Sequence, residues 1–335
     1  MLAACSPTVI PAGESVRAPT LTKDSYVAAD GTALPLAEWK AEKGPPKAVI
    51  LGLHGFGDYR NAFEEPAAVW AKDGITTYSY DQRGFGASPT RGRWPGTDTL
   101  VDDAKAMARL LRQKYPDVPL YVAGESMGGA VAMVAADRGM EDDGLILLAP
   151  AVRSRASFGP LATGAMSFFV HIIPWMPDGP TSIDFEPTDN PKTIEKLQHD
   201  KLMIHQARFD LGYGLLDLMD AAVAAAPRLD KPYIMLHGLG DKIVPGGPVR
   251  TVIATMPRRE DSQLAFYNNG YHLLLRDKEG AKVAVDVATW IGNHEAALPS
   301  GADVAHSEPE IATLWGSERN VSASLPEGTP SPASR

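Results

Sequence analysis

Ser126 stands in the stretch VAGESMGG, flanked by glycines at the point where an apolar run gives way to an alanine-rich one. The run from Leu120 to Ala123 is typical of a buried β-strand, and the run from Met127 to Asp137 is typical of a helix. A serine on a tight strand-to-helix turn can serve as a nucleophile, because the turn exposes its hydroxyl at the carboxyl end of the strand. Gly124 and Gly128 then leave room for the crossing strand and helix. In the alternative interpretation, Ser126 is only a small residue packed against a helix.

A serine nucleophile needs a histidine that accepts its proton and a carboxylate that orients the histidine. In the chain order serine, acid, histidine, the candidate bases are His171, His199, His205, His237, His272, His294 and His306. His272 follows the last β-type run, on a loop from which it can reach back over the sheet edge. Asp241 follows a buried strand in HGLGDKIVP, next to His237, which we expect to be structural. We predict catalysis by Ser126, Asp241 and His272; the alternative is that Asp241 and His272 are ordinary turn and loop residues.

Acyl transfer also requires donors for the negatively charged oxygen of the tetrahedral intermediate, usually backbone N–H groups. The apolar run AVILGL leads into His54-Gly55-Phe56-Gly57, whose glycines let the backbone approach a substrate. We predict the N–H of Phe56 and the N–H of Met127, at a helix N-terminus, to form the oxyanion hole. His54 is expected to brace this loop. A plain strand-to-loop turn is the alternative.

Strand and helix patterns alternate along most of the chain, which predicts parallel strands joined by crossover helices. Predicted strands are Leu34 to Trp39, Ala48 to Leu53, Thr76 to Tyr80, Leu120 to Ala123, Leu145 to Leu148, Tyr233 to Leu236 and Gln263 to Tyr267. Predicted helices are Ala62 to Lys72, Asp98 to Lys114, Met127 to Arg138, Pro248 to Met256 and Ala281 to His294. Ligands of such sheets bind at the carboxyl ends of the strands, where Ser126 is expected.

The segment 151–227 interrupts this alternation with helical patterns only, and we predict it to be a helical cap inserted before the strand that bears the acid. Residues 24–150 and 228–295 then form the α/β core. Residues 1–23 are expected to be a flexible N-terminal segment. Residues 296–335 are expected to be a mostly disordered tail with one short helix near residues 309–315. The uncharged stretch 159–177 contains three prolines that break a membrane-spanning helix, so we interpret it as part of a lid.

Five stretches, in this order, give the chain a resemblance to a known superfamily: LHGFGDY, YSYDQRGFGAS, VAGESMGGAV, HGLGDKIVP and GYHLLLRD. The chain resembles the α/β-hydrolases, specifically the monoglyceride lipase and lysophospholipase branch with its serine-aminopeptidase-like domain. The resemblance covers roughly residues 24–295. It implies the α/β-hydrolase fold, with a mostly parallel central sheet flanked by helices, and the same three catalytic residues. It also implies a structural loop formed by Asp81, Arg83, Gly84, Gly86 and Ser88.

The activity implied is hydrolysis of a carboxylic ester through an acyl-enzyme, as in a lysophospholipase or monoacylglycerol lipase, without cofactor or metal. Apolar cap residues suit a fatty acyl chain, and we take as substrate-binding candidates Phe168, Phe169, Ile172, Trp175 and Leu215. These residues could instead only pack the cap onto the core. Three other functions stay open: a short-chain esterase, an aminopeptidase-type amide hydrolase, and a non-catalytic ligand-binding member of the fold.

Net charge and cysteine content limit the partners. A formal net charge of −9 argues against binding to nucleic acid or to an anionic membrane surface, because both need an excess of Lys and Arg. Cys5 is the one cysteine, so an internal disulfide is excluded and a cysteine-based metal site is not expected.

The opening residues MLAACSPTVIPAGE resemble the lipobox of bacterial lipoproteins and their tether, although no basic or apolar region precedes Leu2. If the true start lies upstream, we expect lipidation of Cys5 and membrane anchoring in a bacterial envelope; otherwise we expect a cytoplasmic protein with a disordered N-terminus. Mass spectrometry of protein expressed from an upstream start would distinguish the two, since an unmodified Cys5 rejects lipidation.

Overall fold

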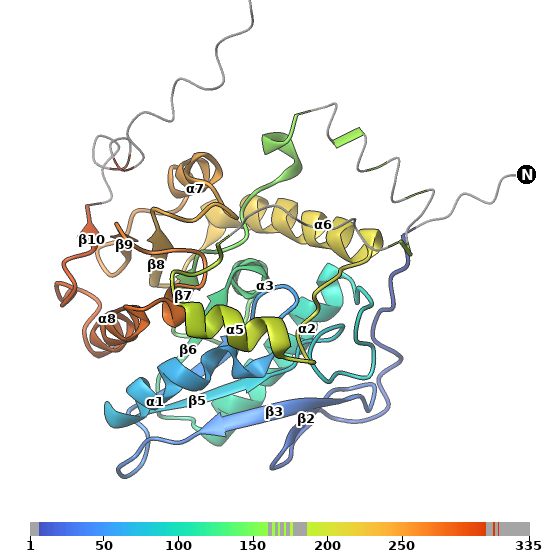
Figure 1. Cartoon of the computed structure of the whole chain (residues 1–335). Coiled ribbons are helices and arrows are strands. Elements are labelled where there is room, and N and C mark those ends of the chain that lie inside the picture. The colour runs from blue at the N-terminus through green and yellow to red at the C-terminus, as the bar shows by residue number, and fades with distance from the viewer. Residues whose placement is uncertain are drawn as a thin grey trace, which may run out of the picture.

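The computed structural model describes residues 7–159 and 186–305, together with 163–164, 167, 171, 175–176, 311 and 314. These residues form a ten-stranded sheet (Figure 1). Its strands are β1 (Thr20–Leu21), β2 (Ser25–Val27), β3 (Ala33–Trp39), β4 (Ala48–Leu53), β5 (Ile75–Tyr80), β6 (Leu120–Glu125), β7 (Gly144–Leu148), β8 (Tyr233–Gly238), β9 (Gln263–Tyr267) and β10 (Asp303–Val304). In space they follow the order β1-β2-β3-β5-β4-β6-β7-β8-β9-β10.

The centre of the sheet is parallel and its edges are antiparallel. Strands β5, β4, β6, β7, β8 and β9 pair in parallel, whereas β1, β2, β3 and β10 run against their neighbours. Every residue of β4, β5, β6, β7 and β8 is buried, as expected for strands covered on both faces. The predicted mostly parallel sheet is confirmed, and the carboxyl ends of its central strands share one edge.

Helices cover both faces of the sheet (Figure 1). The α-helices are α1 (Glu64–Lys72), α2 (Thr97–Lys114), α3 (Met127–Asp137), α5 (Pro191–His199), α6 (Phe209–Ala225), α7 (Gly246–Ile253) and α8 (Gly280–Gly292). Short 3₁₀ helices are η1 (Arg60–Phe63), η2 (Arg155–Ser157), η3 (Ala226–Arg228) and η4 (Leu274–Arg276). Helices α1 and α8 share one hydrophobic cluster with the sheet, and α2, α3, α6 and α7 share the cluster on the opposite face. In β6, Val122 belongs to one cluster and Tyr121 and Ala123 to the other, as the alternation of side chains along a strand requires.

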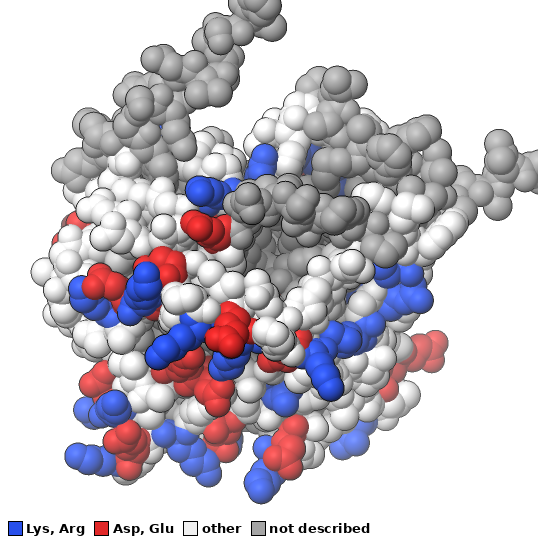
Figure 2. Space-filling view, viewed as in Figure 1, with Lys and Arg blue, Asp and Glu red and all other residues white. Residues whose placement is uncertain are grey.

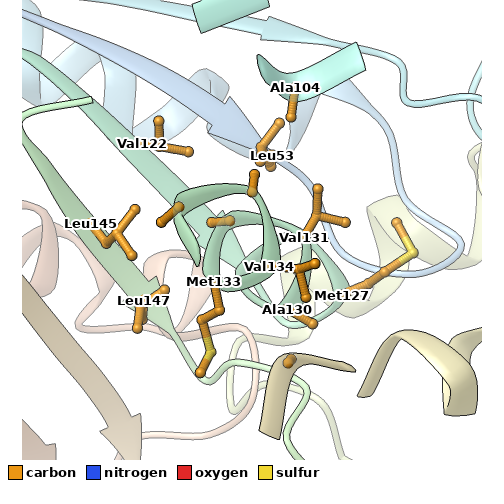
Figure 3. Packing of buried hydrophobic residues seen from close by; sticks show 14 of the residues in the cluster. Leu53, Ala104, Val122, Met127, Ala130, Val131, Met133, Val134, Leu145 and Leu147 are labelled. Carbon is orange, nitrogen blue, oxygen red and sulfur yellow. The ribbon is translucent and has the colours of Figure 1, made fainter. Parts of the chain in front are cut away.

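Helix α3 lies at the centre of the larger cluster (Figure 3). Its residues Met127 to Ala136 are all buried, and its glycines and alanines let the backbone approach the sheet closely. Leu53, Val122, Leu145 and Leu147 of the sheet face it (Figure 3). This packing fixes the first residue of α3, and with it the turn that carries Ser126.

The segment 151–227 contributes α5 and α6 to the described residues. Helix α6 packs against α3, and Leu216, Leu218 and Met219 are buried in the same cluster, so this helix serves the core as well as the predicted cap. The predicted helix near residues 309–315 lies mostly outside the described residues. Within the part of the chain that the structure describes, we find no helix long and apolar enough to cross a membrane.

The flanking segments contact the core. Residues 7–13, which the sequence predicts to be flexible, run beside the loop at Trp94: Val9 forms a bridge with Trp94, and the Ile10 N–H donates to its carbonyl at 2.8 Å. In the predicted C-terminal tail, β10 pairs with β9. Acidic and basic side chains are intermingled over the lower part of the surface shown in Figure 2, and neither sign forms a large patch of its own there.

Candidate active site

Ser126 lies between β6 and α3 in a strained backbone conformation. Its φ of 52° and ψ of −113° fall in a region that L-residues rarely adopt. Its N–H donates to the Leu148 carbonyl at 2.9 Å, and its carbonyl accepts the N–H of Ala151 at 2.9 Å. The end of β7 and the residues after it therefore support the turn. Ala149, which lies between Leu148 and Ala151, also has a positive φ, of 41°. Strain held by such surroundings is typical of a functional turn.

The glycines on each side of Ser126 are required by close contacts. A Cβ atom at Gly128 would lie 1.9 Å from the Leu53 carbonyl oxygen, and one at Gly124 would lie 2.4 Å from the Gly128 carbonyl oxygen. These are backbone atoms, which cannot move aside cheaply. The predicted strand-to-helix turn at Ser126 is thus present, with the glycines in the expected role.

Asp241 and His272 are in direct contact. His272 Nδ1 lies 2.7 Å from Asp241 Oδ2, and both side chains are buried. Asp241 follows β8, and its Oδ1 also accepts the N–H groups of Ile243 and Val244, which fix the carboxylate. His272 follows β9 on a loop held by the Tyr271 N–H, which donates to Asp277 at 2.8 Å. Because β6, β8 and β9 are parallel, Ser126, Asp241 and His272 all lie at the same sheet edge.

The electrostatics distinguish His272 from its neighbour His237. Burial is the largest single effect on the pKa of His272 and lowers it, but the Asp241 carboxylate, its hydrogen bond and Glu125 together outweigh burial, so the pKa lies above the usual 6.5. Burial raises the pKa of Asp241, but His272, His237 and the Val244 N–H together outweigh burial, so the pKa is lowered. His237 is fully buried 4.0 Å from the same carboxylate, and burial lowers its pKa to about 4. His237 is therefore neutral, as expected for a structural histidine.

The loop 54–58 lies beside the nucleophile turn. A Cβ atom at Gly55 would come within 3.5 Å of the Ser126 Cβ, so this loop and the turn are in close approach. His54 braces the loop as predicted: its Nε2 accepts the Gln82 N–H at 3.0 Å, which leaves the proton on Nδ1 to bond the Gly55 carbonyl at 2.8 Å. The ring of Phe56 packs edge-on against Phe85 at 5.5 Å between centroids. Met127 is the buried first residue of α3, as predicted.

The loop 81–88 is a structural support. Asp81 accepts from the Arg60 N–H at 3.0 Å, from the Arg60 guanidinium at 2.6 Å and from the Ala87 N–H at 2.8 Å. Arg83 bridges Asp30 and Asp103, and the hydroxyl of Ser88 accepts the Gly84 N–H at 3.0 Å. These contacts agree with the structural role that the resemblance implies.

A second buried group of charges was missed by sequence reasoning. Arg276 Nη1 lies 2.7 Å from Asp58 Oδ2, and its Nη2 lies 2.6 Å from Glu125 Oε2. We call these three residues the Arg276 cluster. Glu125 ends a strand that is otherwise apolar, and a buried carboxylate there requires a counter-charge. The charge of Glu125 at the end of an apolar strand was the signal in the sequence. Its partner Arg276, however, lies 151 positions further along the chain.

The cap segment is bonded directly to the loop 54–58 and its neighbours. The Ile204 N–H donates to the Gly57 carbonyl at 2.8 Å, and the Tyr59 hydroxyl donates to Asp200 at 2.6 Å. Arg91 donates to the carbonyls of Lys201 and Met203. Residues 200–204 of the predicted cap are therefore held next to the loop that contains Phe56.

The predicted acyl-binding residues are only partly described. Phe168, Phe169 and Ile172 lie outside the described residues, as does Cys5, so acyl contacts and lipidation stay predictions. Trp175 is 54% exposed, while Leu215 is half-buried and packs against the large core cluster. Among the described residues, we find no group of three or more His, Cys, Asp or Glu side chains that could hold a metal ion.

The sequence was compared with known protein families and with curated proteins. Residues 44–279 match the family described as serine aminopeptidase, S33. The chain belongs to this family. The hydrolase is 28% identical to the monoglyceride lipase of Mus musculus over 291 residues, covering 82% of this chain and 92% of that protein. It is 24% identical to the monoacylglycerol lipase of Mycolicibacterium smegmatis, covering 82% of this chain and 98% of that protein.

Solved structures agree on the fold. A soluble variant of the Saccharomyces cerevisiae monoglyceride lipase, in complex with a substrate analog, matches with a TM-score of 0.68 and 19% identity, covering 86% of this chain and all of that one. The Paleococcus ferrophilus monoacylglycerol lipase matches with a TM-score of 0.64 and 21% identity, covering 78% and 99%. The fold is that of the α/β-hydrolases, as predicted, and the chain is a lipase- or esterase-like hydrolase that resembles the monoglyceride lipases.

Proposed function

We propose that this hydrolase cleaves carboxylic esters of the monoacylglycerol or lysophospholipid class through an acyl-enzyme on Ser126. The observation that carries the proposal is a strained serine at the same sheet edge as a buried histidine–aspartate pair. The likeness to monoacylglycerol and monoglyceride lipases over four-fifths of the chain supports the lipid substrate.

In the first half of the reaction, His272 Nε2 takes the proton of the Ser126 hydroxyl as its oxygen attacks the ester carbonyl carbon. The carbonyl π electrons move to the oxygen, and the N–H groups of Phe56 and Met127 stabilise the charge that develops there. Collapse of this intermediate breaks the bond to the alcohol, which takes the proton from His272. Asp241 stabilises the imidazolium that exists between these steps.

In the second half, His272 takes a proton from water, whose oxygen attacks the acyl-enzyme carbonyl. The intermediate expels Ser126, which recovers its proton from His272, and the fatty acid leaves. Asp241 needs no proton of its own at any stage, in agreement with its lowered pKa.

The test compares wild type with Ser126→Ala on p-nitrophenyl esters from C2 to C16, on monoacylglycerol and on lysophosphatidylcholine. We expect serine-dependent hydrolysis of medium or long acyl chains. Ser126→Ala should lower kcat by on the order of 10⁶-fold while the protein stays folded, because one oxygen is removed from the end of a side chain. Activity confined to C2–C4 would indicate a short-chain esterase, and full activity in Ser126→Ala would reject the mechanism.

An aminopeptidase is the second candidate, because the family description names that activity. It would use the same catalytic residues on amides with a free amino terminus. Aminoacyl anilides in the same assay distinguish the two: faster turnover of anilides than of any ester would favour the peptidase. Ligand binding without turnover of either class would indicate a non-catalytic member of the fold.

A further inference from the structure

The Arg276 cluster connects three segments that are far apart in the sequence. Asp58 lies on the loop 54–58, two residues after the proposed oxyanion donor Phe56, and Glu125 directly precedes Ser126. Arg276 itself follows His272 by four residues, in η4. The Arg276 guanidinium thus bonds the segment that contains Phe56 and the segment that contains Ser126. Arg276 itself is part of the segment that contains His272.

The backbone of Arg276 adds a fourth segment. Its carbonyl accepts hydrogen bonds from Thr188 Oγ1 at 3.2 Å, Asn190 Nδ2 at 3.2 Å and Thr193 Oγ1 at 3.0 Å. These three side chains belong to the start of α5 and the residues before it, on the cap segment. The loop that carries His272 is therefore fixed on the core side by the guanidinium and on the cap side by the carbonyl.

Stability alone does not explain this arrangement. The side chains of Arg276, Asp58 and Glu125 are 8%, 6% and 2% exposed, so three charges are taken out of water. Buried charge clusters of this kind can often be replaced by apolar residues without loss of stability. What a guanidinium supplies is geometry, because its planar fork of donors holds two carboxylates in fixed directions.

We propose that Arg276 is a positioning residue: by bridging Asp58 and Glu125, it holds the loop of Phe56, the turn of Ser126 and the loop of His272 in one arrangement. The inference rests on the proposed ester hydrolysis. Arg276 touches no reacting atom in this mechanism and acts through the three segments that it joins.

The cluster also sets the charge around His272. The charged and titratable groups that face this imidazole are His237 in β8, Asp241 on the loop after β8, Glu125 at the end of β6, and Arg276 in η4. Glu125 raises the pKa of His272 and Arg276 lowers it, so the two residues act in opposite directions on the imidazole. Arg276 therefore opposes the effect of the buried Glu125 carboxylate on the proposed base.

The test uses Arg276→Gln, Arg276→Lys and a matched control, Arg83→Gln. Arg83 is also buried and also bridges two carboxylates, with 2.8 Å from Nη1 to Asp30 and 2.6 Å from Nε to Asp103, but it supports the loop 81–88. Each variant is assayed with the p-nitrophenyl ester that the wild type cleaves fastest, and its thermal unfolding is measured in parallel.

We expect Arg276→Gln to lower kcat on the order of a hundredfold with little change in KM, because misplaced groups slow the chemistry more than the binding. Arg276→Lys should recover part of kcat, since an ammonium neutralises the carboxylates but cannot bond both as a planar fork can. Arg83→Gln should lower the Tm but keep kcat. Wild-type kcat in folded Arg276→Gln, or an equal loss of kcat in Arg83→Gln, would overturn the proposal. If Arg276→Gln does not fold, an unchanged kcat in Arg276→Lys overturns it.

A measurement without substrate separates this inference from the proposed function. The His272 Nδ1 proton bonded to Asp241 should give a low-field proton NMR signal, assigned by its loss in His272→Gln. Arg276→Gln should shift or broaden this signal, whereas Arg83→Gln should not. If the wild type hydrolyses no ester, the proposed function fails and the NMR signal alone decides on Arg276; an unshifted signal in Arg276→Gln then rejects its positioning role.

Discussion

At Ser126 the backbone conformation costs on the order of 1–3 kcal/mol, and neighbouring contacts hold the residue there. The Ser126 N–H donates to the Leu148 carbonyl, and the Ser126 carbonyl accepts the Ala151 N–H. With the close backbone contacts at Gly124 and Gly128, these hydrogen bonds hold the turn in its strained conformation. His54 is held in the same way, with both ring nitrogens bonded and a pKa lowered by burial. The groups of the site are thus oriented before a substrate arrives, which is what preorganised catalysis needs.

The pH dependence of ester hydrolysis should report on His272. The base must be neutral, so kcat/KM rises with pH through its pKa, which lies above 6.5 because of Asp241. Asp241→Asn removes the carboxylate that raises this pKa, so the acid limb of the profile should move to lower pH. We also expect kcat to fall by about 10⁴-fold, since the amide no longer holds the productive tautomer.

The control for this variant is Asp217→Asn, which removes an exposed carboxylate of α6 that pairs with Arg155. It should leave both the pH profile and kcat unchanged. An acid limb in Asp241→Asn at the wild-type position would show that His272 is not the group that titrates.

At the scale of elements, α6 illustrates how packing can override helix propensity. Gly214 lies inside this helix, and a Cβ atom there would come within 2.3 Å of the indole of Trp94. Gly212, two residues before it in the same helix, has no atom within 4 Å of such a Cβ. The two glycines therefore have opposite reasons to be present.

We expect Gly212→Ala to raise the free energy of unfolding by about 0.5–1 kcal/mol, through helix propensity. Gly214→Ala should lower it by about 1–3 kcal/mol, because overpacking against Trp94 exceeds the same gain. Chemical denaturation of the two variants beside wild type measures both. Equal effects of the two substitutions would show that α6 does not pack on Trp94 in this way.

Strands β4 and β7 were predictable because each is buried on both faces and reads as an apolar run, and the predicted and observed bounds of β4 are identical. Strands β1, β2 and β10 were missed, because two or three residues are too few to show the alternation of apolar and polar side chains that marks a strand. These residues are strands only because they pair with a neighbouring strand. The helix predicted from Pro248 to Met256 is α7, which begins two residues earlier, at Gly246. Pro248 then lies in the first turn, where a proline is tolerated.

Local motifs were sufficient for the turn of Ser126 and for the loops of Asp241 and His272, because glycines and strand ends mark these places in the sequence. They were not sufficient for the Arg276 cluster. Asp58, Glu125 and Arg276 stand inside the recognised motifs, but their pairing depends on how three strand ends meet in space. The acyl-binding prediction rested on apolar character alone, which does not separate Leu215 from its buried neighbours Leu216 and Leu218.

At the scale of the whole molecule, one buried carboxylate opposes folding. Asp142, just before β7, is 3% exposed, and neither of its oxygens has a hydrogen-bond partner in another described residue. Burial raises its pKa to about 7, with Lys231 as the charge that lowers it and Asp143 and Asp230 as charges that raise it further. The folded protein therefore holds this proton more tightly than the unfolded chain, and stability falls as pH rises from about 4 to about 7.

Asp142→Asn removes this cost. We expect the variant to gain on the order of 1–3 kcal/mol in free energy of unfolding at pH 8, where the wild type must bury a charge. At pH 4 the carboxyl is protonated in the folded protein, so the gain should be largely lost. Urea denaturation at both pH values measures the difference, and a gain of equal size at the two would contradict the role of ionisation.

The two outermost strands, β1 and β10, contain two residues each and run antiparallel to their neighbours. A long exposed outer strand offers a row of backbone donors and acceptors on which a second chain can build amyloid-like stacks. Two residues offer too few such groups to start a stack. Strands β1 and β10 thus end the ladder of hydrogen bonds within one molecule. Because they are so short, they disfavour pairing with the sheet of a second molecule and growth into a fibre.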